Sequence, residues 1–389
     1  MEVRQLRQDE KFDARMISAL AFHGRVEDLE KERADSEKDT AEDWGAFGAD
    51  GRLAAHIIRN RYEYRLDGQW VKGSGIGAVS TLPEYRGRGA IRAIFGELLS
   101  RAYREGEVLS SLYPFNHAFY RKFGYETVCW QDRYAFSPSV LREYSFRGEA
   151  EPLRKGDSAA ERAALCDLFA RGFNLSVRRD GARAPEEFGE GWPKDRRFFY
   201  LLREGGKPVA YLAFRDVRRD SGAVLAVRDY AWDGGRGFRA LLGFLARFSA
   251  DYGSVEITLP SAVRLPCVIH APDAYDIRRE GGCGFMVRAV SARLALEKMA
   301  KPADCDFTVR VTDPLIPENC GVWRVTGDGA VPSDSGADLE VSVQAFSQLV
   351  CGAVSLREAL LREDARMNGN EETLERVFRP KPILVTEAF

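Results

Sequence analysis

Residues 79–96 read Val79-Ser-Thr-Leu-Pro-Glu-Tyr-Arg-Gly-Arg-Gly-Ala-Ile-Arg-Ala-Ile-Phe-Gly96. A run with strand character ends at Leu82-Pro83, a glycine-rich basic turn follows, and an apolar periodic segment comes next. Glycines let the backbone approach a ligand closely, and the first N–H groups of a helix are unpaired and attract negative charge. With the added charge of Arg86, Arg88 and Arg92, this order predicts a turn that binds a phosphate or pyrophosphate.

Two common phosphate-binding loops do not match this turn. A Walker loop needs Gly-Lys-Ser/Thr at the start of the helix, and the turn has neither the lysine nor the hydroxyl. A dinucleotide-binding loop needs a third glycine where Arg92 stands, and an acid about 20 residues further on, for which Glu107 is only weak evidence. The glycine-rich run Gly73–Gly77 precedes the strand and is interpreted as a hairpin exit.

A third loop matches better. Val79 to Gly89 has the pattern Val-x-x-x-Pro-x-x-Arg-Gly-x-Gly, which resembles the acyl-CoA loop of the GCN5-related N-acetyltransferase (GNAT) superfamily. Its sixth position is Ile91 where the superfamily motif has Gly or Ala. About 25 residues on, a short strand at Leu109–Tyr113 precedes Asn116-His-Ala-Phe-Tyr-Arg-Lys-Phe-Gly-Tyr125, which resembles the superfamily segment whose tyrosine lies near the cofactor sulfur.

Bulk composition excludes several function classes. The 389 residues, 45% hydrophobic and 30% charged, are typical of a soluble chain with two or three domains. A net charge of −2 argues against general nucleic-acid binding. The seven cysteines form no Cys-x-x-Cys pair and the four histidines show no ligand spacing, so we expect reduced thiols, no metal and a cytoplasmic location. The sequence shows no signal peptide or apolar membrane span.

The first 145 residues have the pattern of one α/β unit. Apolar spacing predicts a helix over Phe12–Phe22, and strands are predicted at Trp44–Phe47, Ala54–Asn60 and Gly75–Leu82. Between the first helix and the strands, residues 24–43 hold nine acids and four bases. We interpret this segment as a solvated helix or loop; the functional alternative is a rim that attracts cationic substrates.

A second α/β series follows an expected linker near Phe146–Gly156. Its predicted elements are a helix at Ala159–Phe169, strands at Phe198–Leu202, Val209–Asp216 and Val224–Ala231, a helix at Phe238–Phe248 and a strand at Ser254–Leu259. The order echoes the first unit. Its turn, however, carries Asp233 and a single base, Arg236, which predicts a degenerate copy that does not bind CoA.

From about Val290 the sequence predicts a smaller α+β region. Strands are expected at Phe307–Thr312 and Val322–Val325, and Ser355 with Glu358 has the capping-box pattern of a helix start. The final apolar run, ending at Phe389, is expected to be docked rather than frayed.

The whole chain resembles the enhanced intracellular survival (Eis) family. The resemblance implies an α/β (α+β) chain of tandem GNAT folds, the second degenerate, followed by a sterol-carrier-protein-like domain. The expected boundaries are 1–146, 147–289 and 290–389. A homo-oligomer, a hexamer in that family, is also implied.

The resemblance implies acetyl transfer from acetyl-CoA to an amine, with aminoglycosides as known acceptors. Tyr120 would be the general acid that protonates the CoA thiolate, and the terminal carboxylate of Phe389 the general base. The implied acetyl-CoA contacts are Val79, Ser80, Thr81, Gly87, Arg88, Gly89, Ala90, Ile91, Arg92, Phe115 and Asn116.

The chemistry of these groups is compatible with the roles. A phenol with a pKa near ~10 can protonate a thiolate with a pKa near ~8.5 if the transfer is concerted with collapse of the tetrahedral species. A backbone N–H of Ser80 or Thr81 could serve the oxyanion. His117 is a weaker candidate base, and Phe22, Trp192 and Glu387 are candidates for the acceptor pocket.

Two other functions stay open. The acceptor could be a lysine of a peptide or protein, as the related architecture of N-myristoyltransferases illustrates. The C-terminal domain could instead make the chain a lipid-binding module, although the intact Arg-Gly-Arg-Gly turn argues against this as its main role.

Overall fold

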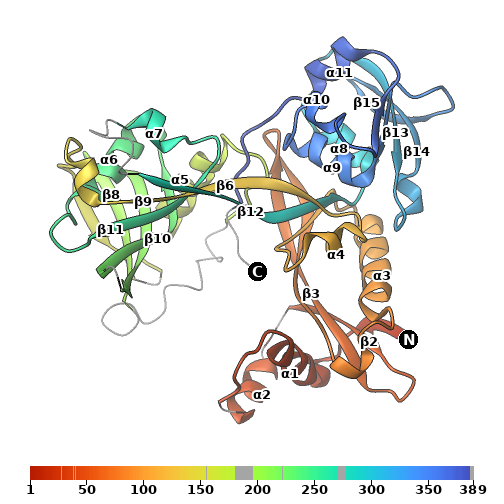
Figure 1. The fold of residues 1–389 in the computed structure, drawn as a ribbon, viewed down its shortest axis with the longest axis horizontal. Helices are drawn as coiled ribbons and strands as arrows, with labels where there is room; N and C mark the ends of the chain where they lie inside the picture. The colour runs from red at the N-terminus through yellow and green to blue at the C-terminus, as the bar shows by residue number, and fades with distance from the viewer. Residues whose placement is uncertain are drawn as a thin grey trace. The chain divides into compact units, whose positions relative to one another are not determined.

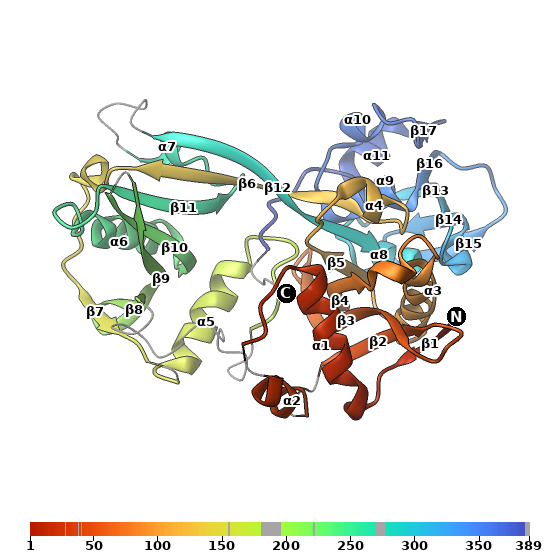
Figure 2. The same cartoon turned by 60° about the horizontal axis from the view of Figure 1, so that its bottom comes forward.

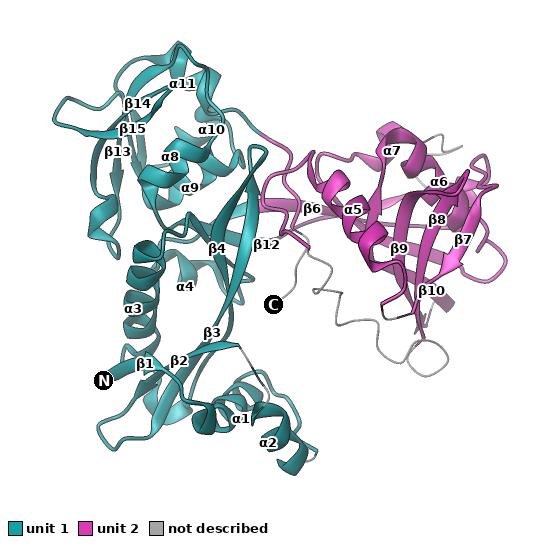
Figure 3. Ribbon diagram, turned by 180° about the vertical axis from the view of Figure 1, so that it is seen from behind, with its two compact units in different colours: residues 1–128, 285–380, 387–389 teal, residues 129–284, 381–386 magenta. Residues whose placement is uncertain are grey.

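The computed structural model describes residues 1–27, 29–37, 39, 41–154, 156–179, 196–220, 222–269 and 277–385, apart from the side chain of Cys283 (Figure 1). It divides into two compact units, coloured separately in Figure 3. Unit 1 comprises residues 1–128, 285–380 and 387–389, and unit 2 comprises residues 129–284 and 381–386. Strands β6 (Glu126–Phe136) and β12 (Arg278–Ala289) each have residues in both units.

The first sheet of unit 1 holds the predicted phosphate turn. Its strands follow the order β1-β2-β3-β4-β5-β12. Neighbours pair antiparallel except β4 and β5, which are parallel and are joined through helix α3. The new strands and the helix span β1 Glu2–Gln5, β2 Glu42–Phe47, β3 Leu53–Leu66, β4 Gln69–Thr81, β5 Leu109–Leu112 and α3 Ala90–Arg104.

Helices cover both faces of this sheet (Figure 2). The two-residue period of a strand separates the faces along β2, and the register shift against β3 between Ala46 and Phe47 lets Leu53 and Ile57 face opposite sides. Trp44 and Ile57 pack with α3, whereas Phe47 and Leu53 pack with α1 (Lys11–Ala21). Helix α2 (Leu29–Glu37) contacts α1, and α4 (His117–Arg121) follows β5.

The C-terminal part of unit 1 has a second sheet with the order β15-β14-β13-β16-β17. The parallel pair β13 and β16 lies at its centre and the other neighbours are antiparallel. Its elements are α8 Ala292–Lys298, β13 Asp306–Thr312, β14 Gly321–Thr326, β15 Gly329–Ser333, β16 Leu339–Ser342, α9 Val343–Cys351, α10 Leu356–Ala359, β17 Ala365–Met367 and α11 Glu371–Val377.

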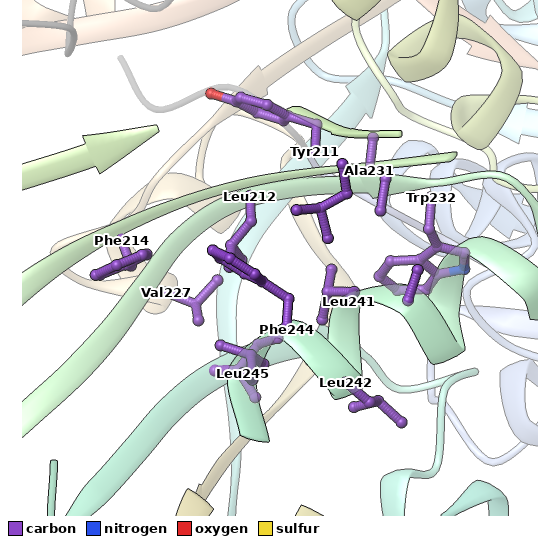
Figure 4. Packing of buried hydrophobic residues seen from close by; sticks show 14 of the residues in the cluster. Tyr211, Leu212, Phe214, Val227, Ala231, Trp232, Leu241, Leu242, Phe244 and Leu245 are labelled. Carbon is purple, nitrogen blue, oxygen red and sulfur yellow. The ribbon is translucent and has the colours of Figure 1, made fainter. Parts of the chain in front are cut away.

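Unit 2 repeats the strand-helix-strand arrangement. Its sheet order is β6-β11-β10-β9-β8-β7, and β10 and β11 are parallel with α6 between them. Leu241, Phe244 and Leu245 of α6 pack against Leu212 and Val227 of the sheet (Figure 4). The elements are β7 Glu149–Pro152, α5 Ala159–Ala170, β8 Arg197–Glu204, β9 Lys207–Arg219, β10 Gly222–Trp232, α6 Gly234–Ala246, β11 Ser254–Pro260 and α7 Leu265–Val268.

The predicted α/β (α+β) fold class is confirmed, and most predicted elements lie within a few residues of the observed ones. Two local predictions are wrong. The expected linker at Phe146–Gly156 contains strand β7, which pairs with β8. Gly73–Gly77 is not a hairpin exit but the interior of β4, where a Cβ on Gly73 would lie 2.4 Å from the Leu109 carbonyl. Glycine is needed there because β5 approaches closely.

Among the described residues, no helix combines the length and apolar character that a membrane crossing requires. The predicted docking of the chain end is seen up to residue 385. Ile383 forms a parallel bridge with Asn174, and Leu384 is buried in the core of unit 2.

Candidate active site

The phosphate turn has the backbone shape that its glycines predict. A short turn of 3₁₀ helix at Pro83–Tyr85 ends β4, and α3 begins after Gly89. Gly87 and Gly89 have φ values of 75° and 81°, in the left-handed region that other residues rarely adopt. The first helical hydrogen bond of α3 joins the Ala93 N–H to the Gly89 carbonyl at 3.0 Å, which leaves the N–H groups of the first helical turn without a partner in the helix.

The positive charge of this turn is open to a ligand. Arg86, Arg88 and Arg92 are exposed, and within the described ranges none of them forms an ion pair. The Arg88 guanidinium stands 5.5 Å from the Tyr85 ring centre. The first turn of α3 carries no acidic residue. The N–H groups, the helix dipole and three cations therefore act together on an anion placed here.

Beyond the phosphate turn, the β5 side of strand β4 has no paired strand after Ile76 among the described residues. Parallel pairing with β5 ends at Ile76 and Leu112. At the next residues β4 carries a bulge, because His56 pairs with Ser80 but Ile58 pairs with Gly77, and Ala78 has φ 51°. A bulge breaks the ladder and leaves backbone groups unpaired. The predicted contacts Val79, Ser80 and Thr81 follow directly, and an extended amide ligand could pair with them.

The Ser80 side chain points into a buried polar network that sequence reasoning missed. Its Oγ lies 3.2 Å from Ser18 Oγ on α1, and Ser18 Oγ lies 3.1 Å from His56 Nδ1. His56 Nε2 is 2.6 Å from Asp43 Oδ1, and Lys11 Nζ is 3.1 Å from the other Asp43 oxygen. Because its side chain is buried in this network, Ser80 presents mainly its backbone to a ligand. The network ties α1 to β2, β3 and β4.

Tyr120 sits on the one-turn helix α4, whose start is fixed by a predicted residue. Asn116 is the N-cap, and its side-chain oxygen accepts a hydrogen bond from the Phe119 N–H at 3.0 Å. This bond orients the turn and accounts for asparagine here. Phe115 is 67% exposed, and its ring centre lies 5.3 Å from that of Tyr120.

The Tyr120 ring is packed but its hydroxyl is unpaired. The residue is 3% exposed and contacts Phe95, Phe119 and Tyr125 edge to face. Burial, with a smaller contribution from Tyr125, raises the pKa of Tyr120 well above 10. Within the part of the chain that the structure describes, no group hydrogen-bonds to its hydroxyl. Tyr120 is therefore a neutral phenol with a proton available to an external group.

The three predicted segments meet on one hydrophobic cluster. Val79 from β4, Ile91 from α3 and Phe119 from α4 are partly buried against the cluster that contains Tyr120 and Phe95. The phosphate turn, the open strand edge and the tyrosine thus share a core. A ligand that runs from the turn along β4 is held by the same packed elements as Tyr120.

The other candidate residues have different outcomes. Glu107 is buried and its carboxylate lies 2.7 Å from the Arg59 guanidinium, so it cannot serve a ribose as the dinucleotide alternative would need. Phe22 ends α1 and is 58% exposed. Phe389, Trp192 and Glu387 lie outside the described residues.

The equivalent turn of unit 2 is chemically different. Asp233 is the N-cap of α6, and the only base of the turn, Arg236, is bound by Glu204 at 2.5 Å. A Cβ on Gly237 would lie 2.0 Å from the Val209 carbonyl, so the backbone is tightly packed rather than open. These contacts leave little positive charge for a phosphate, in agreement with a degenerate copy.

Comparisons with known proteins agree with this geometry. Residues 2–128 match the family described as acetyltransferase (GNAT) domain, and residues 287–384 match the sterol carrier protein domain. An uncharacterized N-acetyltransferase of Streptomyces coelicolor is 28% identical over 392 residues, covering 92% of this chain and 91% of the relative.

Two solved structures share the fold over the full length of this chain. A GCN5-related N-acetyltransferase from Anabaena variabilis has a TM-score of 0.85 at 19% identity, and all of both chains is covered. Eis1 from Mycobacterium abscessus has a TM-score of 0.80 at 18% identity, with the same full coverage. The Eis-like arrangement expected from the sequence is therefore supported at the level of the fold.

Proposed function

We propose that this chain, an N-acetyltransferase with a GNAT domain at residues 2–128, transfers the acetyl group of acetyl-CoA to an amine of a small polycationic acceptor such as an aminoglycoside. The observation that carries the proposal is the turn at Arg86–Arg92. Its two left-handed glycines, open helix start and three cations without carboxylate partners among the described residues suit the pyrophosphate of CoA.

Acetyl-CoA supplies an activated thioester when bound. The turn would fix the pyrophosphate, and the β4 backbone at Val79–Thr81 would pair with the pantetheine amides. The same backbone offers an N–H donor to the carbonyl oxygen as negative charge develops on it. Arg88 and Arg92 lie at the helix start, so their charges reinforce its dipole.

Tyr120 would act as the general acid. It is protonated at neutral pH, as a proton donor must be, although its raised pKa makes it a weaker acid than a free phenol. A phenol of high pKa does not give up its proton in advance, so the transfer to sulfur must accompany cleavage of the C–S bond. The unpaired hydroxyl is free to take that position.

The acidic segment before β2 supports a cationic acceptor. Glu30, Asp35 and Glu37 of α2 are exposed and form no ion pair within the described part of the chain. Such a surface would attract a polyamine by long-range electrostatics. The terminal carboxylate of Phe389 would orient the amine and accept its proton; an unperturbed terminal carboxyl has a pKa near ~3.5, so burial must raise it.

The test is thiol release from acetyl-CoA with a panel of amines: aminoglycosides, linear polyamines and lysine peptides, measured with wild type and with Phe389 deleted. We expect turnover with aminoglycosides or polyamines and its loss on deletion. Higher turnover with lysine peptides would show that the acceptor is a peptide or protein lysine and not a small polycationic amine. Absence of turnover with every amine, together with no binding of acetyl-CoA, would refute the proposed activity.

The resemblance to the Eis family also implies a homo-hexamer, which we propose as the assembly state. Sedimentation velocity at several concentrations measures it directly. A sedimentation coefficient of a monomer at every concentration would refute the hexamer and would leave the proposed reaction unaffected.

A further inference from the structure

The turn that follows Tyr120 is held by side chains from the C-terminal half of unit 1. Three of its backbone carbonyls accept a side-chain donor from that region. Gln344 Nε2 is 3.0 Å from the Arg121 carbonyl, Arg288 Nη1 is 2.7 Å from the Phe123 carbonyl, and Gln348 Nε2 is 2.7 Å from the Thr127 carbonyl. Helix α9 carries both glutamines.

A buried carboxylate links the same turn to a fourth side chain. Glu126 is fully buried. One oxygen accepts from Arg121 at 2.8 Å and from the Thr127 N–H at 2.9 Å, and the other lies 3.0 Å from Arg362 Nη1. Arg362 also donates to the Gln348 side-chain oxygen at 3.2 Å. Removal of Arg362 would leave a buried carboxylate with one cation fewer.

Arg288 is anchored before it reaches the turn. Its guanidinium is fully buried and pairs with Asp313, which in turn accepts from Asn319 at 2.9 Å and from the N–H of Leu315 at 2.9 Å. The Phe123 carbonyl is therefore bound by a guanidinium that cannot rotate freely. A donor that is itself held in place restrains the position of the carbonyl that it binds.

Gly124 shows how closely the two regions approach. It has φ 82°, and a Cβ there would lie 2.9 Å from Val343 Cγ1 and 3.0 Å from Arg288 Nη1. Both the backbone shape and the absence of a side chain are thus needed at this point. At Gly124 the C-terminal region is therefore packed closely against the turn.

We propose that Arg288, Gln344, Gln348 and Arg362, which we call the clamp residues, are positioning residues that fix the Tyr120 hydroxyl for proton transfer. The C-terminal half of unit 1 would then be part of the catalytic apparatus by way of this turn, separately from the chain terminus. The inference rests on the proposed role of Tyr120 as general acid.

Helix α4 is too short to hold its own geometry. It has five residues, far fewer than a helix needs for stability on its own, so tertiary contacts decide its geometry. Asn116 secures its start, and the clamp residues secure the chain after its end. Proton transfer is steep in distance, and a shift of about 1 Å can lower a rate by roughly 100-fold.

The experiment compares Arg362→Ala with Arg357→Ala in the full chain. Arg357 is the matched control, because it is an exposed arginine of the same region paired with Glu375 at 2.7 Å. We expect Arg362→Ala to lower kcat by about 10- to 100-fold, with the KM for acetyl-CoA within about threefold of wild type. Arg357→Ala should retain wild-type kcat, and Arg362→Lys should recover part of the loss.

A double-mutant cycle with Tyr120→Phe tests whether the effect passes through the tyrosine. If the clamp acts on Tyr120, Arg362→Ala lowers kcat far less in the Tyr120→Phe background than in wild type. Equal losses in both backgrounds would overturn the proposal, as would unchanged kcat in a folded Arg362→Ala protein. Gln344→Ala removes a single hydrogen bond from a half-buried side chain and provides the same comparison if Arg362→Ala does not fold.

The outcomes separate the clamp from the proposed function. Inactive wild type would refute the proposed reaction. Active wild type with unaffected Tyr120→Phe would refute the acid role and, with it, the clamp. Active wild type that loses activity on Tyr120→Phe but not on Arg362→Ala or Gln344→Ala would refute the clamp alone.

Discussion

The ring of Tyr120 packs edge to face on Phe95, with centroids 6.4 Å apart and an interplanar angle of 86°. Phe95 lies on α3, the helix whose first turn forms the phosphate site. The candidate acid Tyr120 therefore packs directly on the helix that begins at the candidate cofactor site. Displacement of either element would change the distance between the anchored cofactor and the proton donor.

Replacement of Tyr120 by Phe should lower kcat by roughly 100-fold or more, because it removes the proton donor and leaves the packing intact. The measurement is steady-state thiol release at saturating acetyl-CoA. Tyr125→Phe is the control: its hydroxyl bonds Ser110 at 2.7 Å, so it should lose about 1 kcal/mol of stability with little change in kcat. Similar kcat values for the two variants would place Tyr120 among packing residues.

Arg86→Ala and Arg88→Ala should each raise the KM for acetyl-CoA. A hydrogen bond to a charged group contributes about 1.5–3 kcal/mol, which corresponds to roughly 10- to 100-fold. Arg236→Ala in unit 2 is the matched control, since Glu204 already binds that guanidinium. The KM should also rise with salt, because these charges are exposed. A KM insensitive to both arginines would mean that the pyrophosphate binds elsewhere.

Replacement by alanine should change the free energy of unfolding in opposite directions at two glycines of the same segment, Gly89 and Gly96. Gly89→Ala forces an L-residue into φ 81° and should destabilise the fold by about 1–2 kcal/mol while raising the KM for acetyl-CoA. Gly96 lies inside α3, and no atom stands within 4 Å of the position that a Cβ would take, so Gly96→Ala should stabilise by up to ~1 kcal/mol. Urea denaturation compares the two; a stabilising Gly89→Ala would contradict the strained geometry.

Acid should weaken unit 1 partly through Glu105. Burial acts to raise the pKa of Glu105, but hydrogen bonds from Arg101 and Arg59 outweigh it and lower the pKa to about 2. Because its pKa is lower in the folded state than in the unfolded state, the Glu105 carboxylate stabilises the fold at pH values above about 4.5. This stabilisation is lost as the pH falls from about 4.5 towards 2. Denaturation midpoints between pH 7 and pH 2.5 should decline less steeply for Glu105→Gln than for Glu97→Gln, an exposed substitution in α3, the helix that Glu105 caps.

The phosphate turn was predictable because its information is local. Gly87 and Gly89 need left-handed φ, and the residues around them have the composition of a strand end and a helix start. Ser355 was likewise recognisable as a helix cap from Glu358 three residues later, whereas the capping role of Asn116 was not predicted. Helices and strands could be told apart from the spacing of their apolar residues, because this spacing also involves only neighbouring residues.

What could not be predicted depends on contacts distant in the sequence. In the buried polar network, Ser18 and Ser80 are in hydrogen-bond contact although 62 residues separate them, and Asp43 and His56 are 13 residues apart. Arg288 stands in a glycine-rich, charged stretch, and only its pairing with Asp313 shows why an arginine can be buried there. Strand β12 has few strand-forming residues at its start, and only its pairing with β5, far away in the sequence, shows that it belongs to the sheet.

The pairing of β5 with β12 can form only after a long delay during synthesis of the chain. Strand β5 emerges at Leu112, but its antiparallel partner is complete only at Ala289, 177 residues later (289 minus 112). At ~5–20 residues per second, the ribosome needs on the order of 10–35 seconds to deliver it. During that interval β5 is an open sheet edge to which other chains can add, so slower synthesis between β5 and β12 should lower the yield of folded enzyme.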